Sequence, residues 1–169
     1  AVELAARAVE SFDVPPRPFA VSVALFRATS APPQQGKPTP IAEQLRGVRA
    51  RLRRLFAYTD YTPIDEVVLQ GREGEPVSWN LGGSYRIDFL LEAENGDEVV
   101  RLRNLVLVRV RRDENGRETV RDVARTSINL KTWEPFVLGV GREEGGSAAL
   151  FLVLSAAPAG PGPGTGGFR

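Results

Sequence analysis

The sequence predicts an α+β protein that consists mainly of an antiparallel β-sheet or β-sandwich, covered by one amphipathic helix. Most of the chain consists of short runs in which apolar and polar residues alternate, as in strands with one buried face. Turns such as "GREGE", "ENGD" and "DENGR" separate these runs at a density typical of antiparallel sheets. One segment instead carries apolar residues at helical spacing. The length of 169 residues suits a single domain.

The first expected strand is "FAVSVALFRA" at residues 19–28. Phe19, Val21 and Val23 fall on one of its faces, and the smaller Ala20 and Ser22 fall on the other. After residue 60 the chain continues as a series of similar runs. The expected strands there are Ile64–Gln70, Pro76–Leu81, Ser84–Ala93, Glu98–Arg111, Glu118–Leu130, Pro135–Val140 and Ser147–Ser155.

The helix is expected to begin after Thr39, which is a suitable N-cap, with Pro40 at the first helical position. Apolar residues then recur at spacings of three and four. They are Ile41, Leu45, Val48, Leu52 and Leu55. The opposite face carries Arg46, Arg49, Arg53 and Arg54. We interpret this segment as a helix that covers the sheet and turns its arginines to solvent; a helix lying on a membrane surface is the alternative.

The composition excludes several classes of chemistry. The chain contains no Cys, His or Met, so thiolate nucleophiles, imidazole relays and zinc sites built from these residues are excluded. The only notable group of carboxylates is Asp60, Asp65 and Glu66, and its spacing specifies no catalytic geometry. We therefore expect a protein that is not an enzyme and that needs no cofactor or metal. Its net charge of +1 provides no strong field toward nucleic acid.

The run "VVRLRNLVLVRVRR" raises the question whether its arginines bind a partner or form one solvated face of a strand. A two-residue turn at Asn95-Gly96 would place Leu91 opposite Val100 and Asp88 opposite Arg103. Apolar side chains would then share one face, and arginines would meet carboxylates on the other. We therefore interpret Arg101 and Arg103 as ordinary cross-strand ion pairs, with Glu92 diagonal to Arg101.

The end of the same run is less well explained. A two-residue turn at Asn115-Gly116 would place Arg109 opposite Asp122, but it would also place Val110 opposite Arg121. This poor match predicts a bulge or a longer loop. Arg109, Arg111 and Arg112 remain as candidate contacts with an acidic partner. We expect no nucleic-acid binding, because no recognition motif accompanies them.

The aromatic residues allow two interpretations. Trp79, Trp133, Tyr58 and Tyr61 are the notable ones, and burial in the core is the commoner fate of such residues in one domain of this size. If they are exposed on a sandwich instead, they can stack on sugar rings. A carbohydrate-binding β-sandwich module is therefore the alternative function.

The two ends of the chain differ in composition from the middle. We divide the chain into an N-terminal extension (residues 1–18), a single α+β domain (residues 19–157) and a C-terminal tail (residues 158–169). The tail contains eight Gly or Pro in twelve residues, which cannot form a core. Phe168 and Arg169 are its candidate partner contacts. We therefore expect a structural subunit that contacts neighbouring proteins of a larger complex through its extensions.

The segments "FAVSVALFRA", "LRGVRARLRRLFAYTDY" and "SINLKTWEPFVLGVG…ALFLVLSA" follow one another over residues 19–156. This layout resembles uncharacterised exported α+β proteins of GC-rich bacteria and, more distantly, an accessory extrinsic subunit of a bacterial photosynthetic reaction-centre complex. The resemblance implies a periplasmic or other extracytoplasmic protein, peripheral to a membrane. The start at Ala1 rather than Met agrees with removal of an export signal. We expect no transmembrane segment, because no apolar run reaches the required ~18 residues.

Overall fold

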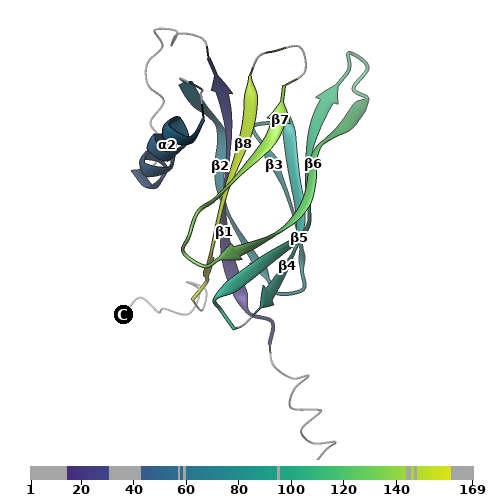
Figure 1. Ribbon diagram of the computed structural model, residues 1–169. Coiled ribbons are helices and arrows are strands. Elements are labelled where there is room, and N and C mark those ends of the chain that lie inside the picture. Colours follow the sequence, from purple (N-terminus) through teal and green to yellow (C-terminus); the bar gives the residue numbers. More distant parts are fainter. Residues whose placement is uncertain are drawn as a thin grey trace, which may run out of the picture.

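The computed structural model describes residues 15–30, 43–56, 58, 60–94, 96–143, 146 and 148–160 (Figure 1). In this part of the chain, two four-stranded antiparallel sheets and one helix form a β-sandwich with a covering helix, which confirms the predicted fold class. The elements are β1 (Pro18–Thr29), α2 (Glu43–Leu55), β2 (Asp60–Arg72), β3 (Pro76–Leu81), β4 (Tyr85–Glu94), β5 (Val99–Arg112), β6 (Glu118–Lys131), β7 (Phe136–Arg142) and β8 (Ala149–Pro158).

Every strand that the sequence predicts is present. The bounds of β3 agree with the prediction, while β2 begins at Asp60, four residues earlier than Ile64. Strand β8 continues to Pro158, so the first residue of the expected tail belongs to the sheet. The predicted helix cap at Thr39 and the residues 161–169 of the tail lie outside the described residues. No helix within the described ranges is long and apolar enough to cross a membrane.

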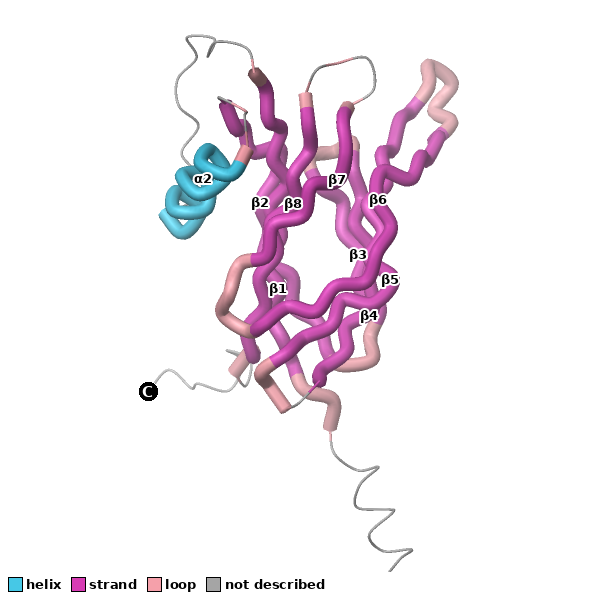
Figure 2. Tube along the Cα trace, in the orientation of Figure 1, coloured by secondary structure: helices cyan, strands magenta, loops and turns pink. Residues whose placement is uncertain are grey.

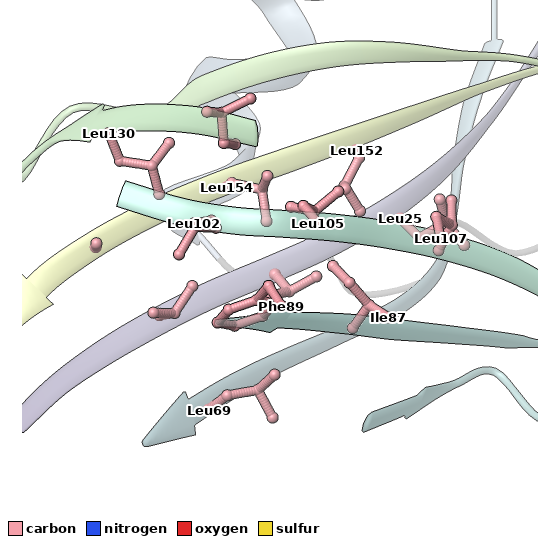
Figure 3. Close-up of a cluster of buried hydrophobic side chains, with 14 of the residues drawn as sticks. Leu25, Leu69, Ile87, Phe89, Leu102, Leu105, Leu107, Leu130, Leu152 and Leu154 are labelled. Atoms are coloured by element: carbon pink, nitrogen blue, oxygen red, sulfur yellow. The ribbon is translucent and has the colours of Figure 1, made fainter. Parts of the chain in front are cut away.

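The core lies between the two sheets. The first sheet has the order β2-β1-β8-β7 and the second has the order β3-β4-β5-β6. Alternate residues of β4 point into this core, from Tyr85 to Leu91. Figure 3 shows Leu102, Leu105 and Leu107 of β5 in the same cluster as residues from the first sheet. Burial of these alternating apolar residues stabilises the sandwich without disulfide bonds.

Strand β1 is apolar on both faces because the helix covers its outer face. Phe26 and Ala28 of β1 pack with Leu52 of α2 in a second buried cluster. Figure 2 shows α2 beside β1 and β2, on the side away from the second sheet. Arg46 and Arg53 on the opposite helix face are exposed, as expected for a covering helix.

The predicted register of the first hairpin is wrong. Strands β4 and β5 pair Leu91 with Leu102, and Glu94 with Val99, so the loop between them is longer than two residues. One strand is displaced by two residues relative to the other, compared with the prediction, which preserves the faces and changes the partners. The Cα of Arg103 consequently lies opposite that of Leu90, and its side chain forms an ion pair with the diagonal Glu92 at 3.2 Å instead of with Asp88. The interpretation of Arg101 and Arg103 as cross-strand ion pairs is confirmed, since Arg101 lies 3.4 Å from Glu94.

Strand β5 contains an unpredicted bulge. The register with β4 shifts between the pairs Leu90–Arg103 and Asp88–Val106. Asn104 lies in this interval with a φ of 51°, and its backbone N–H donates to the Ser127 hydroxyl at 3.0 Å. Asn adopts this left-handed conformation more readily than branched residues do. The extra residue reverses the alternation of every side chain that follows it in β5.

The irregularity predicted for the second hairpin is confirmed. Arg112 pairs with Glu118, so residues 113–117 form the loop, and the register shifts again between Leu107 and Val108. Arg109 therefore lies opposite Arg121 rather than Asp122. The prediction placed Asp122 opposite Arg109 because it was based on a two-residue turn at Asn115-Gly116.

Candidate partner-binding surface

Strands β5 and β6 extend past the rest of their sheet as a two-stranded hairpin. Strand β4 begins at Tyr85, which pairs with Arg109, so Arg111 and Arg112 pair with β6 alone. We call residues 109–121 the arginine ribbon. It lies on the opposite side of the molecule from α2 (Figure 1). The ribbon brings together Arg109, Arg111 and Arg112, the three candidate contacts that the sequence singled out within the domain.

The arginines occupy both faces of the ribbon. Arg109 shares a face with its partner Tyr85, whose ring is 2% exposed and belongs to the core cluster between the sheets. Arg111 is two residues further and lies on this same inner face, while Val110 and Arg112 lie on the outer face. Val120, the partner of Val110, is 48% exposed. The ribbon thus combines positive charge with exposed apolar surface.

An open groove of about 830 Å³ lies beside the base of the ribbon. Trp79 lines it together with the polar side chains of Ser78 and Asn80. Basic residues line it as well, since Arg111 and Arg112 contribute from the ribbon. Its lining also includes Gly83, Ser84, Tyr85, Arg86, Val110 and Glu118.

The two tryptophans are exposed, which corrects the expectation that burial is their commoner fate. Trp79 is 48% exposed in the groove, and Trp133 is 75% exposed in the turn before β7. Trp133 also has a φ of 69°, which is unusual for a bulky residue. Tyr61 does join the buried cluster under α2, where its hydroxyl donates to the Leu52 carbonyl at 3.1 Å. Its burial raises the pKa of the Tyr61 hydroxyl.

A smaller cavity of about 190 Å³ lies between the ends of the two sheets. We call it the arginine pocket. Tyr85, Arg109 and Arg121 line it from the second sheet, and Arg142 and Glu143 line it from the end of β7. Asp122, Val123, Val140, Gly141 and Leu150 complete the lining.

Glu143 is held at the edge of this pocket by a network that joins the sheets. Arg27 of β1 donates to both carboxylate oxygens, at 2.9 and 2.7 Å. Tyr85 of β4 donates its hydroxyl to the same carboxylate at 2.8 Å. Hydrogen bonding by Arg27 lowers the pKa of Glu143, and the carboxylate in turn raises the pKa of Arg27. Burial, and then the hydrogen bond to Glu143, raises the pKa of Tyr85, which therefore remains a neutral donor.

Arg109 acts on Glu143 only through its charge, which helps to lower the pKa of that carboxyl. It is half-buried, and its Nε–H is inaccessible to solvent without a hydrogen-bond acceptor. A buried donor without an acceptor costs about 1–3 kcal/mol. Asp122, the second carboxylate of the pocket, bonds Arg125 at 3.0 Å and is not paired with Arg109. The pocket therefore contains a guanidinium N–H group that lacks a hydrogen-bond acceptor.

The sequence did not identify Tyr85, Glu143 or Arg142 as members of a site. Tyr85 and Glu143 are 58 residues apart, and Arg27 is 116 residues from Glu143, so no local spacing links them. The other two predicted contacts, Phe168 and Arg169, lie outside the described residues.

Two of the three carboxylates considered for catalysis, Asp60 and Asp65, have structural partners. Asp65 accepts the backbone N–H groups of Glu66 and Gly82, at 2.8 and 2.9 Å. Gly82 is required there, because its φ is 57° and an added Cβ would lie 2.7 Å from the Ile64 side chain. Asp60 bonds Arg49 of α2 at 3.4 Å. Among the described residues no group of three or more carboxylates is arranged to hold a metal ion.

Comparisons of the chain with protein-family models, with curated protein sequences and with solved structures find no match.

Proposed function

We propose that the protein is a non-catalytic subunit of a larger protein complex, and that the arginine ribbon binds an acidic surface of a neighbouring subunit. The observation that carries this proposal is the projection of the ribbon past its sheet, with arginines on both faces. Its exposed Val120 and the nearby Trp79 supply apolar contact area. Arginine and aromatic residues are enriched at the energetically dominant positions of protein interfaces.

The resemblance described above supports a complex outside the cytoplasm and peripheral to a membrane. The extrinsic side of a photosynthetic reaction centre is the specific case that we propose. The terminal extensions contribute further contacts in this proposal, with Phe168 and Arg169 in the C-terminal tail. Fractionation of cells of the natural source, with detection of the protein in the extracytoplasmic fraction, tests the location.

The decisive experiment compares two pairs of charge reversals in native co-purification. One variant carries Arg111→Glu and Arg112→Glu in the ribbon. The control carries Arg53→Glu and Arg54→Glu on the exposed face of α2, and thus has the same change in net charge. We expect the wild type and the helix variant to retain a stoichiometric partner, and the ribbon variant to lose it. A wild type that purifies alone contradicts the proposal, and so does equal retention by the two variants.

The exposed Trp79 favours carbohydrate binding as a second candidate function. A half-exposed indole ring in a groove with hydroxyl and amide side chains can stack on a sugar ring while Ser78 and Asn80 bond its hydroxyls. The groove volume lies within the ~300–1,000 Å³ of ligand pockets.

Affinity electrophoresis in gels that contain polysaccharide tests this second candidate. Trp79→Ala should abolish any retardation, while Trp133→Ala, which removes the other exposed tryptophan, should leave it intact. Migration of the wild type at the same rate with and without polysaccharide contradicts carbohydrate binding.

A further inference from the structure

Three arginines and two carboxylates line the arginine pocket, and both carboxylates are also bonded by arginines from outside it. Glu143 is engaged by Arg27 at 2.7 Å, and Asp122 is engaged by Arg125 at 3.0 Å. Both of these arginines lie outside the pocket lining. Arg109 and Arg142, which do line it, form no ion pair with a carboxylate in the described part of the chain. Glu143 attracts Arg109 electrostatically, but its hydrogen bonds go to Arg27 and Tyr85. The arginines of the lining therefore outnumber its carboxylates by one, and a further anion would balance them.

The surroundings of Arg109 favour the binding of an anion in the arginine pocket. Its Cα pairs directly with that of Arg121 on β6, so the cross-strand neighbour of Arg109 is not a carboxylate. Its buried Nε–H lacks an acceptor. A carboxylate bound in the pocket would satisfy this donor.

The size and surroundings of the pocket limit what can enter it. Its volume of about 190 Å³ is smaller than the ~300–1,000 Å³ of pockets that enclose small-molecule ligands. A second hollow of about 220 Å³ on the ribbon shares Arg109 and Arg121 with it and continues to Arg111. Tyr85 lines both the arginine pocket and the open groove that contains Trp79. One extended segment of a partner can therefore lie along the ribbon and place a single side chain in the pocket.

We propose that the arginine pocket receives the carboxylate of one Asp or Glu side chain from an acidic segment of a partner protein, bound by Arg109 and Arg142. This inference rests on the proposed function, since it names the group by which the partner is recognised. Arg109 provides the buried donor, and Arg142 closes the site from the opposite sheet. The arginines of the ribbon then attract the remaining acidic residues of the segment.

The test measures binding of a fluorescein-labelled decamer of glutamate by fluorescence anisotropy at low salt, with a decamer of glutamine as the uncharged reference. Arg142→Gln removes one charge in the pocket, and Arg46→Gln removes one charge on the exposed face of α2 as the matched control. Loss of one charge-assisted hydrogen bond should weaken binding about tenfold in the pocket variant. The helix variant should bind as the wild type does. The Nε–H resonance of Arg109 should shift when the glutamate decamer binds.

The outcomes separate this inference from the proposed function. If Arg111→Gln with Arg112→Gln abolishes binding while Arg142→Gln has no effect, the ribbon binds acidic segments but the pocket is not used. The inference then falls and the proposed function stands. If the wild type binds the glutamate and the glutamine decamers equally, both the inference and the proposed function are wrong. Free glutarate that binds as tightly as the decamer overturns the assignment to a protein partner.

Discussion

Glu143→Gln is the substitution that best tests the link between the two sheets. It removes the charge but keeps the size of a side chain that is 14% exposed. The paired Arg27 side chain is 42% exposed, so solvent screening limits this ion pair to about 1 kcal/mol at most. The weakened hydrogen bond from the buried Tyr85 hydroxyl adds about 0.5–1 kcal/mol. We therefore expect a loss of about 1–2 kcal/mol in the free energy of unfolding at neutral pH.

The effect of this substitution should depend on pH in one direction. Hydrogen bonding lowers the pKa of Glu143 in the folded protein below its ordinary value of 4.5. The stability that comes from the ionised carboxylate is therefore complete above the unfolded pKa, and it is lost as the pH falls through the lower, folded pKa. The difference between wild type and Glu143→Gln should be constant from pH 7 down to about 5 and shrink on further acidification.

Urea denaturation, followed by tryptophan fluorescence at several pH values, measures both effects. Glu134→Gln is the control, because Glu134 forms an exposed ion pair with Lys131 in a turn and does not join the sheets. We expect no measurable change in stability for this variant at any pH. A stability difference for Glu143→Gln that persists unchanged below pH 4 would refute the assigned role of the ionised carboxylate.

Three further predictions concern the backbone and the register. Asn104→Val should lose about 1–2 kcal/mol of stability because a branched side chain is strained at positive φ, while Asn104→Gly should be nearly neutral in the same denaturation assay. Trp133→Gly should raise the melting temperature, because the exposed indole contributes little burial and glycine relieves a φ strain of about 1–3 kcal/mol. A double-mutant cycle with Arg103→Glu and Glu92→Arg should show a coupling of about 0.5 kcal/mol, whereas a cycle between Arg103 and Asp88 should show none.

The strands and the helix could be predicted because each depends on a local pattern. Alternation in β4 and the spacing of Val48 and Leu52 in α2 both place apolar side chains on one face, and burial of that face selects the element. The hairpin register depends instead on the length of the loop. Asn95-Gly96 favours a two-residue turn, but the carbonyl of Glu98 accepts the backbone N–H of Thr132 at 2.9 Å. That distant contact belongs to the longer loop, and no local sequence signal shows it.

The bulge in β5 left a signal in the sequence that the prediction did not use. The buried residues Leu102 and Leu105 are three apart, whereas a regular strand places residues of one face two apart. One extra residue must therefore lie between them. The Tyr85–Glu143–Arg27 network had no such signal, because its members come from three strands or their ends and meet only when the two sheets pack.

The two bulges decide which way the ribbon arginines face. Without the extra residue at Asn104, Arg109 would fall on the solvent side of β5; the bulge turns it toward Tyr85 and the space between the sheets. Inward-pointing charges also protect exposed sheet edges from pairing with other chains. That explanation suffices for Arg121, because β6 is an edge strand. It does not suffice for Arg109, whose strand is paired on both sides at that position. Glu143 gives part of the reason, because the Arg109 charge helps to lower the pKa of that carboxyl. It leaves the Arg109 Nε–H without an acceptor, and a bound carboxylate would supply one.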